Sequence, residues 1–209
     1  MRERRRMIQV IPFPHRFRYE GAPLICFLDL QLEYVAEGRA LALEERSPWM
    51  QNCRRLLAFA RAERMSIAHF RQLWRGTLLN PATPFAGWIE EFRPRPSEMV
   101  FERNMPSCYA ADGFVSILDN IDSPRLVLAG LTGHGACLAT ALDGFHRKHQ
   151  ITFVHDASST PQLGKFSAPE SHAYLAEVMT CYAEVVSTEH VIEQLSGPPL
   201  KADAMSGAK

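Results

Sequence analysis

One cysteine of this chain lies where a helix is expected to begin. The run RLVLAG (125–130) predicts a buried strand, and HGACLATALDGFHRKH (134–149) predicts the helix after it, so Cys137 falls in the first helical turn. A helix N-terminus stabilises a thiolate, and amides of this turn, namely those of Gly133, Ala136 and Cys137, can hold an oxyanion during acyl transfer. These features favour a cysteine nucleophile. The alternative is a small buried residue that packs the helix onto a sheet.

A nucleophilic cysteine needs a general base, and Asp29 is the candidate. It falls near the end of the apolar run PLICFLDL (23–30), which predicts a strand buried on both faces. Since neighbouring parallel strands bring their carboxyl ends to one edge of a sheet, Asp29 is expected to approach Cys137. Taken alone, Asp29 is better explained as a turn or helix-capping residue. The joint placement of both residues at strand ends favours the catalytic interpretation.

The glycines of the same segment suggest a second possibility, a phosphate-binding loop. A strand, the sequence GLTGHG, a helix and a strand ending at Asp156 follow one another as in a dinucleotide-binding unit. However, the glycine spacing is G-x-x-G-x-G and not G-x-G-x-x-G. We therefore prefer a tight strand-to-helix turn, which Gly133 and Gly135 would permit, over dinucleotide binding.

The elements that must position these residues alternate along the chain. Strands are predicted at 23–30, 66–70, 98–103, 125–130 and 150–156, with a last short strand near the C-terminal end. Helices are predicted at 47–65, 85–92, 108–120, 134–149 and 167–188, the last opened by a Ser-x-x-Glu capping box. This order predicts an α/β fold, doubly wound in three layers around a mainly parallel sheet of roughly six strands. The domain is expected over 22–196, between an N-terminal arm (1–21) and a flexible tail (197–209).

Composition narrows the class of protein. The 209 residues have a formal net charge of zero, which gives no global electrostatic argument for binding nucleic acid or an anionic membrane. No apolar run is long enough to span a bilayer, and proline and charge interrupt the N-terminal apolar stretch. The five cysteines form no CxxC pair, as expected for free thiols in a reducing compartment. A cytoplasmic protein is expected.

Three segments resemble the isochorismatase-like cysteine hydrolases. FLDLQLEYV resembles the D-x-Q segment after that family's first strand, and VFERNMPSCYAADGF resembles its K-x-x-x-S-A-F segment after the third. LVLAGLTGHGACLATALDGFHRKHQITFVHDA resembles its G-x-x-T-x-x-C-V block, with one residue more between Gly130 and Cys137. The resemblance implies that Asp29 is the general base and Cys137 the nucleophile, and that Arg103 takes the place of the catalytic lysine. It also implies a non-proline cis peptide, expected at Thr132–Gly133.

The same resemblance implies the chemistry. Family members with the cysteine hydrolyse C–N bonds of small amide, carbamoyl or urea-type substrates through a thioester. Residues 32–68 contain no histidine and His69 stands alone, so a zinc site is not expected, and no cofactor is implied. The partners implied are a small-molecule substrate and further copies of the chain, a homo-oligomer. The alternative is a weak or inactive relative that binds a small ligand or partner, because a guanidinium cannot shuttle protons as a lysine does.

Substrate-binding residues are also expected from the resemblance. Aromatic residues that could form a pocket wall are Phe70, Trp74, Phe85, Trp88 and Tyr109, of which we prefer Tyr109 for the pocket and Phe85 and Trp88 for the core. The loop residues Thr132, Gly133 and His134 are expected to contact substrate. Gln31 either joins them or, as we prefer, supports Asp29 and the backbone.

Overall fold

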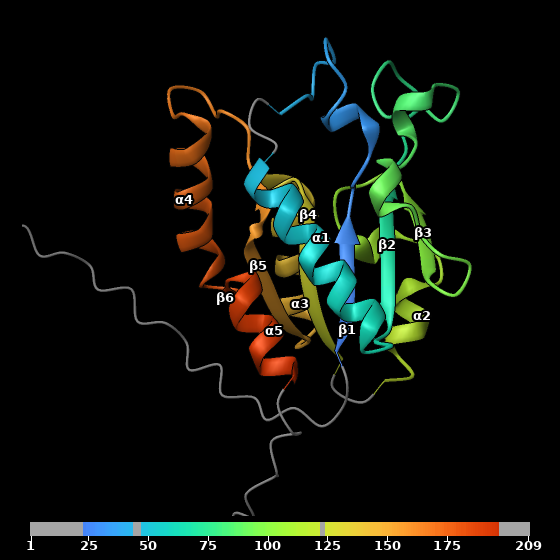
Figure 1. Ribbon diagram of the computed structural model, residues 1–209, viewed down its shortest axis with the longest axis vertical. Helices are drawn as coiled ribbons and strands as arrows, with labels where there is room; N and C mark the ends of the chain where they lie inside the picture. Colours follow the sequence, from blue (N-terminus) through green and yellow to red (C-terminus); the bar gives the residue numbers. More distant parts are fainter. Residues whose placement is uncertain (1–22, 44–46, 122–123, 197–209) are drawn as a thin grey trace, which may run out of the picture.

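The computed structural model describes residues 23–43, 47–121 and 124–196, so the predicted arm (1–21) and tail (197–209) lie outside the described part of the chain. Six strands form one sheet in the order β3-β2-β1-β4-β5-β6, and every neighbouring pair is parallel (Figure 1). The strands are β1 Leu24–Leu28, β2 Ile67–Gln72, β3 Met99–Arg103, β4 Arg125–Leu131, β5 Gln150–Ser159 and β6 Glu184–Val186. The predicted fold class is confirmed.

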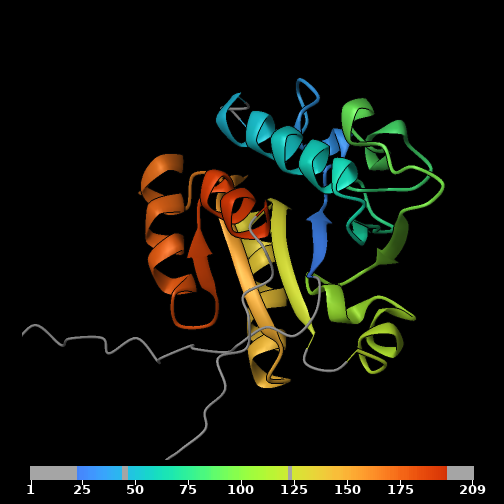
Figure 2. The same cartoon turned by 60° about the horizontal axis from the view of Figure 1, so that its bottom comes forward.

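Helices cover both faces of the sheet and make the three layers (Figure 2). Helices α1 (Ser47–Ala62) and α5 (Thr188–Ser196) pack on one face, where the alternate β1 residues Ile25 and Phe27 belong to the same buried cluster. The other face is covered by α2 (Phe114–Leu118), α3 (Leu138–His146) and α4 (Ala168–Met179). Every residue of β1 is buried, as the continuous apolar run predicts for a central parallel strand. None of the described helices is both long and apolar enough to cross a bilayer.

Short turns complete the fold. The 3-10 turns are η1 Leu32–Tyr34, η2 Pro84–Ala86, η3 Glu90–Phe92 and η4 Cys108–Ala110, and a π-helical turn, η5, covers Gly133–Cys137. The predicted helix over 85–92 is wrong: η2 and η3 stand there instead, with extended backbone at Gly87 between them. The predicted helix over 167–188 is too long, because α4 ends at Met179 and β6 follows within that range.

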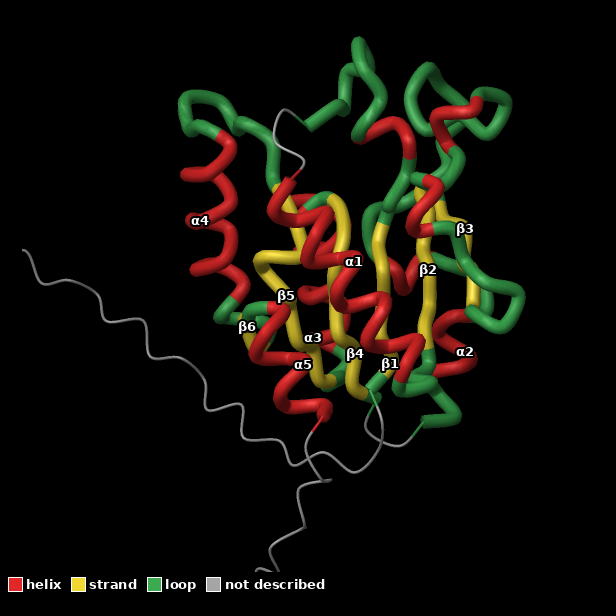
Figure 3. Tube along the Cα trace, viewed as in Figure 1, coloured by secondary structure: helices red, strands yellow, loops and turns green. Residues whose placement is uncertain are grey.

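The order of the strands determines where a site can form. The chain builds β1, β2 and β3 outward in one direction, then returns to place β4, β5 and β6 on the other side of β1. The direction of winding therefore changes between β1 and β4, and ligands of doubly wound folds bind beyond the carboxyl ends of strands at such a point. Long loops gather at this end of the sheet (Figure 3).

Candidate active site

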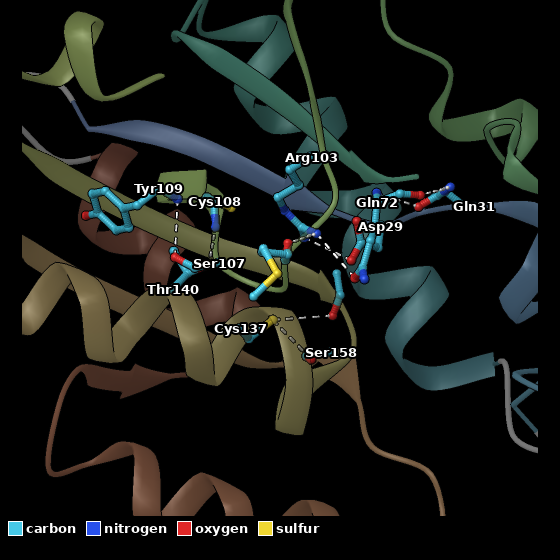
Figure 4. Close-up of polar contacts among 12 residues, drawn as sticks. Asp29, Gln31, Gln72, Arg103, Ser107, Cys108, Tyr109, Cys137, Thr140 and Ser158 are labelled. Atoms are coloured by element: carbon cyan, nitrogen blue, oxygen red, sulfur yellow. Dashed lines mark hydrogen bonds and ion pairs between the residues drawn. The ribbon is translucent and has the colours of Figure 1, made fainter. Parts of the chain in front are cut away.

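The predicted triad comes together beyond the carboxyl ends of the strands (Figure 4). Asp29 directly follows β1 and has left-handed backbone (φ 50°), a conformation that aspartate tolerates better than most residues. Arg103 is the last residue of β3 and pairs in register with Gln72 of β2. Its Nη2 donates to Asp29 Oδ2 at 2.9 Å, and both side chains are at most 1% exposed. The pair therefore reaches across the intervening strand β2, beside Cys137.

Arg103 is held on several sides. Its Nη1 donates to the Met105 carbonyl at 3.0 Å and to Gln72 Oε1 at 3.4 Å. Desolvation lowers the pKa of Arg103, but the Asp29 carboxylate and the Cys108 thiol raise this pKa above its usual value. The guanidinium therefore stays charged. Burial raises the pKa of Asp29, and the neighbouring Arg103 charge opposes that rise. Asp29 Oδ1 has no hydrogen-bond partner within the described part of the protein.

Cys137 is the last residue of η5 and is fully buried. Its Sγ lies 3.8 Å from the Gly130 carbonyl oxygen and 3.8 Å from the hydroxyl of Ser158 on β5. Desolvation raises the pKa of the Cys137 thiol to about 12, although Ser158 and Arg103 favour the thiolate. In this conformation Cys137 is therefore a neutral thiol without exposed surface.

The extra residue between Gly130 and Cys137 is accommodated by the π turn. The Thr132 carbonyl accepts hydrogen bonds from the amides of Gly135 and Cys137, each at 3.2 Å. The second bond joins residues five apart, the spacing of a one-turn π-helix. It occupies the Cys137 amide, so the predicted oxyanion role is left to the amides of Gly133 and Ala136. A non-proline cis peptide is present at Leu131–Thr132, one residue before its predicted position.

Gln31 is a structural residue here. Its side-chain amide donates to the carbonyls of Gln72 (3.1 Å) and Ala86 (2.9 Å), and its Oε1 accepts from the Gln72 amide at 3.0 Å. It thereby joins the end of β2 to η2 and supports the loop after β1. This agrees with the preferred interpretation and uses both donors of its side-chain amide within the protein.

The structure does not bring Phe70 and Tyr109 to the triad. Phe70 has no exposed surface, stacks on Phe101 and meets Phe114 edge-to-face. The Tyr109 hydroxyl bonds to His149 Nδ1 at 2.9 Å, and the ring points away from Cys137 (Figure 4). Both are core aromatics: Phe70 lies within β2 and Tyr109 within η4, and both belong to the buried cluster on the face covered by α2 and α3. We therefore omit them from the substrate site.

A cavity of about 410 Å³, the His134 cavity, lies over the carboxyl ends of the strands. Its polar lining residues are Tyr34, Gln72, Thr132 and His134. Its larger apolar lining residues are Leu41, Leu43, Trp74, Leu78 and Leu79, and two alanines and Pro161 complete it. Thr132 and His134, which are predicted to contact substrate, thus line a cavity. Gly133 does not line it and faces Ser158, Thr160 and Leu175 instead.

Sequence reasoning missed Tyr34, Gln72 and Ser158. Tyr34 falls inside the quoted FLDLQLEYV segment, and its phenol interacts electrostatically with Asp29, Arg103 and Cys137, although burial is the main reason its pKa is raised. Gln72 carries no motif and is recognised only because β2 pairs with β3. Ser158 directly follows the quoted V-H-D-A sequence, and this position near a predicted strand end could have marked it as a site residue. Within the described ranges, no group of three or more His, Cys, Asp or Glu side chains could hold a metal ion.

Comparisons with known proteins agree with this geometry. Residues 23–190 match the model of the isochorismatase domain. The chain is 26% identical over 171 residues to the secreted isochorismatase effector Isc1 of Verticillium dahliae, covering 80% of this chain and 89% of the relative. An isochorismatase of Pseudomonas putida KT2440 superposes with a TM-score of 0.73 at 25% identity, covering 82% of this chain and 93% of the other. N-carbamoylsarcosine amidase of Thermoplasma acidophilum superposes with a TM-score of 0.66 at 20% identity, covering 81% and 98%. The chain belongs to the isochorismatase domain family.

Proposed function

We propose that this chain is a metal-independent cysteine hydrolase that cleaves the C–N bond of a small amide or urea-type substrate. The observation that carries the proposal is the buried Asp29–Arg103 ion pair beside the Cys137 thiol, at the switch point of the sheet. The three residue types supply a base, a fixed positive charge and a nucleophile.

The reaction begins when substrate displaces the groups that enclose Cys137. Asp29 accepts the thiol proton, and the Cys137 thiolate attacks the carbonyl carbon. The amides of Gly133 and Ala136 stabilise the oxyanion of the tetrahedral intermediate. Asp29 returns its proton to the leaving nitrogen, and an amine or ammonia departs from a Cys137 thioester. Water, deprotonated by Asp29, then hydrolyses the thioester to the acid or carbamate and restores the thiol.

Arg103 takes no proton in this scheme. Its guanidinium orients Asp29 and favours the carboxylate form, which burial alone would disfavour. The same charge stabilises the thiolate as it forms, because Arg103 lowers the pKa of Cys137 against the effect of burial. Asp29 therefore carries every proton transfer.

The test is the Cys137→Ala variant, assayed for ammonia release from a panel of small amides and ureas. Hydrolysis is expected to fall by about 10⁴-fold or more, since the nucleophile is lost. Mass spectrometry of the wild type during turnover should show the acyl group on the peptide that contains Cys137. Cys181→Ala is the matched control, because Cys181 is a partly exposed thiol after α4 and should be dispensable. Full hydrolysis by Cys137→Ala would contradict the mechanism.

A second candidate is a catalytically idle relative that binds a small ligand. The enclosed Cys137 thiol, with a pKa of about 12, favours it. The two candidates differ in the substrate-bound state. If an amide that binds accelerates alkylation of Cys137 by iodoacetamide when only part of the protein is bound, amide binding opens the site to an active form. If every amide only protects the thiol and none is hydrolysed, the idle form is the correct one.

A further inference from the structure

The His134 cavity adjoins the triad through three of its lining residues. Gln72 accepts from Arg103 Nη1 at 3.4 Å, and the carbonyl of Thr132 accepts from the Cys137 amide at 3.2 Å. The buried Tyr34 phenol interacts electrostatically with Asp29, Arg103 and Cys137 together. A molecule that reacts at Cys137 can therefore extend into this cavity.

No charged side chain lines the cavity within the described part of the chain. Its polar groups are a phenol, an amide, a hydroxyl and an imidazole. Burial raises the pKa of Tyr34, and desolvation lowers the pKa of His134, so both are neutral at pH 7. The Nδ1 atom of His134 is buried and has no hydrogen-bond partner among the residues that the structure describes, which leaves it available to a neutral donor or acceptor.

Two arginines that neighbour lining residues of the cavity are already paired with carboxylates. Arg103 is paired with Asp29, and Arg39 makes a two-pronged ion pair with the fully buried Glu33, at 2.9 and 3.0 Å. Arg39 also donates to the Thr77 carbonyl, which precedes the wall residue Leu78. A carboxylate entering the cavity would lose water without gaining a counter-charge, which is strongly unfavourable.

The rest of the wall is apolar. Leu41, Leu43, Trp74, Leu78 and Leu79 provide it, and about 410 Å³ is within the range of small-molecule sites. We infer that the substrate is an uncharged amide or urea-type compound whose second part is an apolar or aromatic group without a carboxylate. This inference rests on the proposed function and names the substrate class of the same site.

A matched pair of ligands tests it directly. Benzamide and 4-carbamoylbenzoate have the same ring and amide and differ by one carboxylate. Calorimetric titration of the Cys137→Ala variant should show benzamide binding at least ~10-fold more tightly. Equal or tighter binding of the carboxylate, or binding of neither compound, would overturn the inference.

A charge placed in the wall should reverse the preference. Leu78→Arg adds a cation to the cavity and is expected to tighten binding of 4-carbamoylbenzoate by ~10-fold or more relative to benzamide. Val100→Arg is the control, because Val100 is 46% exposed on the edge strand β3 and does not line the cavity. An equal effect of the two substitutions would show that net charge, and not the cavity, selects the ligand.

Hydrolysis separates this inference from the proposed function. Selective binding of benzamide with no turnover of any amide would refute the hydrolase and retain the neutral cavity. Turnover that depends on Cys137 but prefers the carboxylated compound would retain the hydrolase and refute the neutral cavity.

Discussion

At the scale of single residues, Arg103 decides what acid–base chemistry this site can perform. The family pattern has lysine here, which can lose its proton when buried, whereas a guanidinium remains charged. The ion pair with Asp29 and the bond to the Met105 carbonyl also hold the group in one orientation. The charge of Arg103 is thus constant across the pH range of folding, and proton transfer is left to Asp29.

Arg103→Lys should add a pH dependence that the wild type lacks. A buried ammonium loses its proton at high pH, so kcat/KM of the variant should fall on the alkaline side, where residue 103 of the wild type cannot titrate. Arg103→Gln should lower kcat/KM by about 100-fold or more at all pH values, because Asp29 loses its counter-charge. The measurement is kcat/KM between pH 6 and 10 on a responsive amide.

Arg71→Lys is the control, since Arg71 on β2 makes an exposed ion pair with Glu102. Its profile should follow the wild type. The same alkaline fall in the wild type and in Arg103→Lys would show that another group titrates there.

Residue types and the family resemblance could predict the candidate triad but not the substrate wall. Asp29 and Cys137 fall beside predicted strand ends, and the resemblance assigns Arg103 to the lysine position. The strand order that brings Asp29 and Arg103 together comes from the structure. Aromatic residues have no such distinction, because Phe70 and Trp74 are equally suited to a core or a pocket. Burial separates them: Phe70 is fully enclosed, and Trp74 is 53% exposed at the cavity. That difference depends on packing across the sheet, which a single sequence does not display.

At the scale of elements, η5 docks closely on its neighbours. A Cβ added at Gly133 would lie 2.5 Å from Leu175 Cδ2 of α4 and 2.8 Å from Thr160 Oγ1. Only glycine lets this turn approach β5 and α4 so closely, and the same approach sets Cys137 against Ser158. Gly133 therefore shapes the turn that carries Cys137, the proposed nucleophile, as the preferred interpretation of GLTGHG predicts.

Gly133→Ala should destabilise the protein by about 1–3 kcal/mol, because its methyl group overpacks the contact with α4. Leu175→Ala in the same chain removes the nearest obstructing atom, so the double variant should be more stable than the sum of the single effects predicts. Denaturant unfolding of the four proteins measures this coupling. Strict additivity would show that Gly133 is needed for another reason.

Element boundaries were harder to predict than their order. The apolar stripe of α4 continues through Tyr182, and no glycine or proline marks its end, so periodicity extends the helix to 188. Pairing with β5 overrides this local pattern and makes Glu184–Val186 a strand. At 85–92, Pro84 and Gly87 favour short turns over a continuous helix. By contrast, the capping box was predictable from spacing alone, and Glu170 accepts from both the amide and the hydroxyl of Ser167.

At the scale of the whole molecule, a buried network joins the helical layer to the sheet. Arg61 of α1 binds both oxygens of Glu98, at 2.7 and 3.0 Å, and also the Arg93 carbonyl. Glu98, just before β3, in turn accepts from the Arg95 amide and contacts Nε2 of the fully buried His69 on β2. The network links three chain segments that the hydrophobic pattern alone does not join, and none of its members lines the His134 cavity.

This network should make folding stability depend on pH. The pKa of Glu98 is lowered to about 2. Partial burial raises this pKa, but the hydrogen bonds and charges of Arg61, the Arg95 amide and His69 lower it by more. A depressed carboxyl pKa stabilises the fold above the unfolded value, near 4.5, and that stability is lost as pH falls toward 2. Glu98→Gln should therefore lower the free energy of unfolding by up to about 3 kcal/mol at pH 7, and the difference from wild type should narrow between about pH 4.5 and 3.

His69 adds a second pH dependence. Desolvation lowers the pKa of His69, so its protonation also destabilises the folded wild type as pH falls below 6.5. Urea unfolding at a series of pH values measures the gap, with Glu91→Gln, in a surface pair with Arg54, as the control that should cost under about 1 kcal/mol. A gap that stays constant down to pH 3 would show that Glu98 contributes through packing and not through its charge.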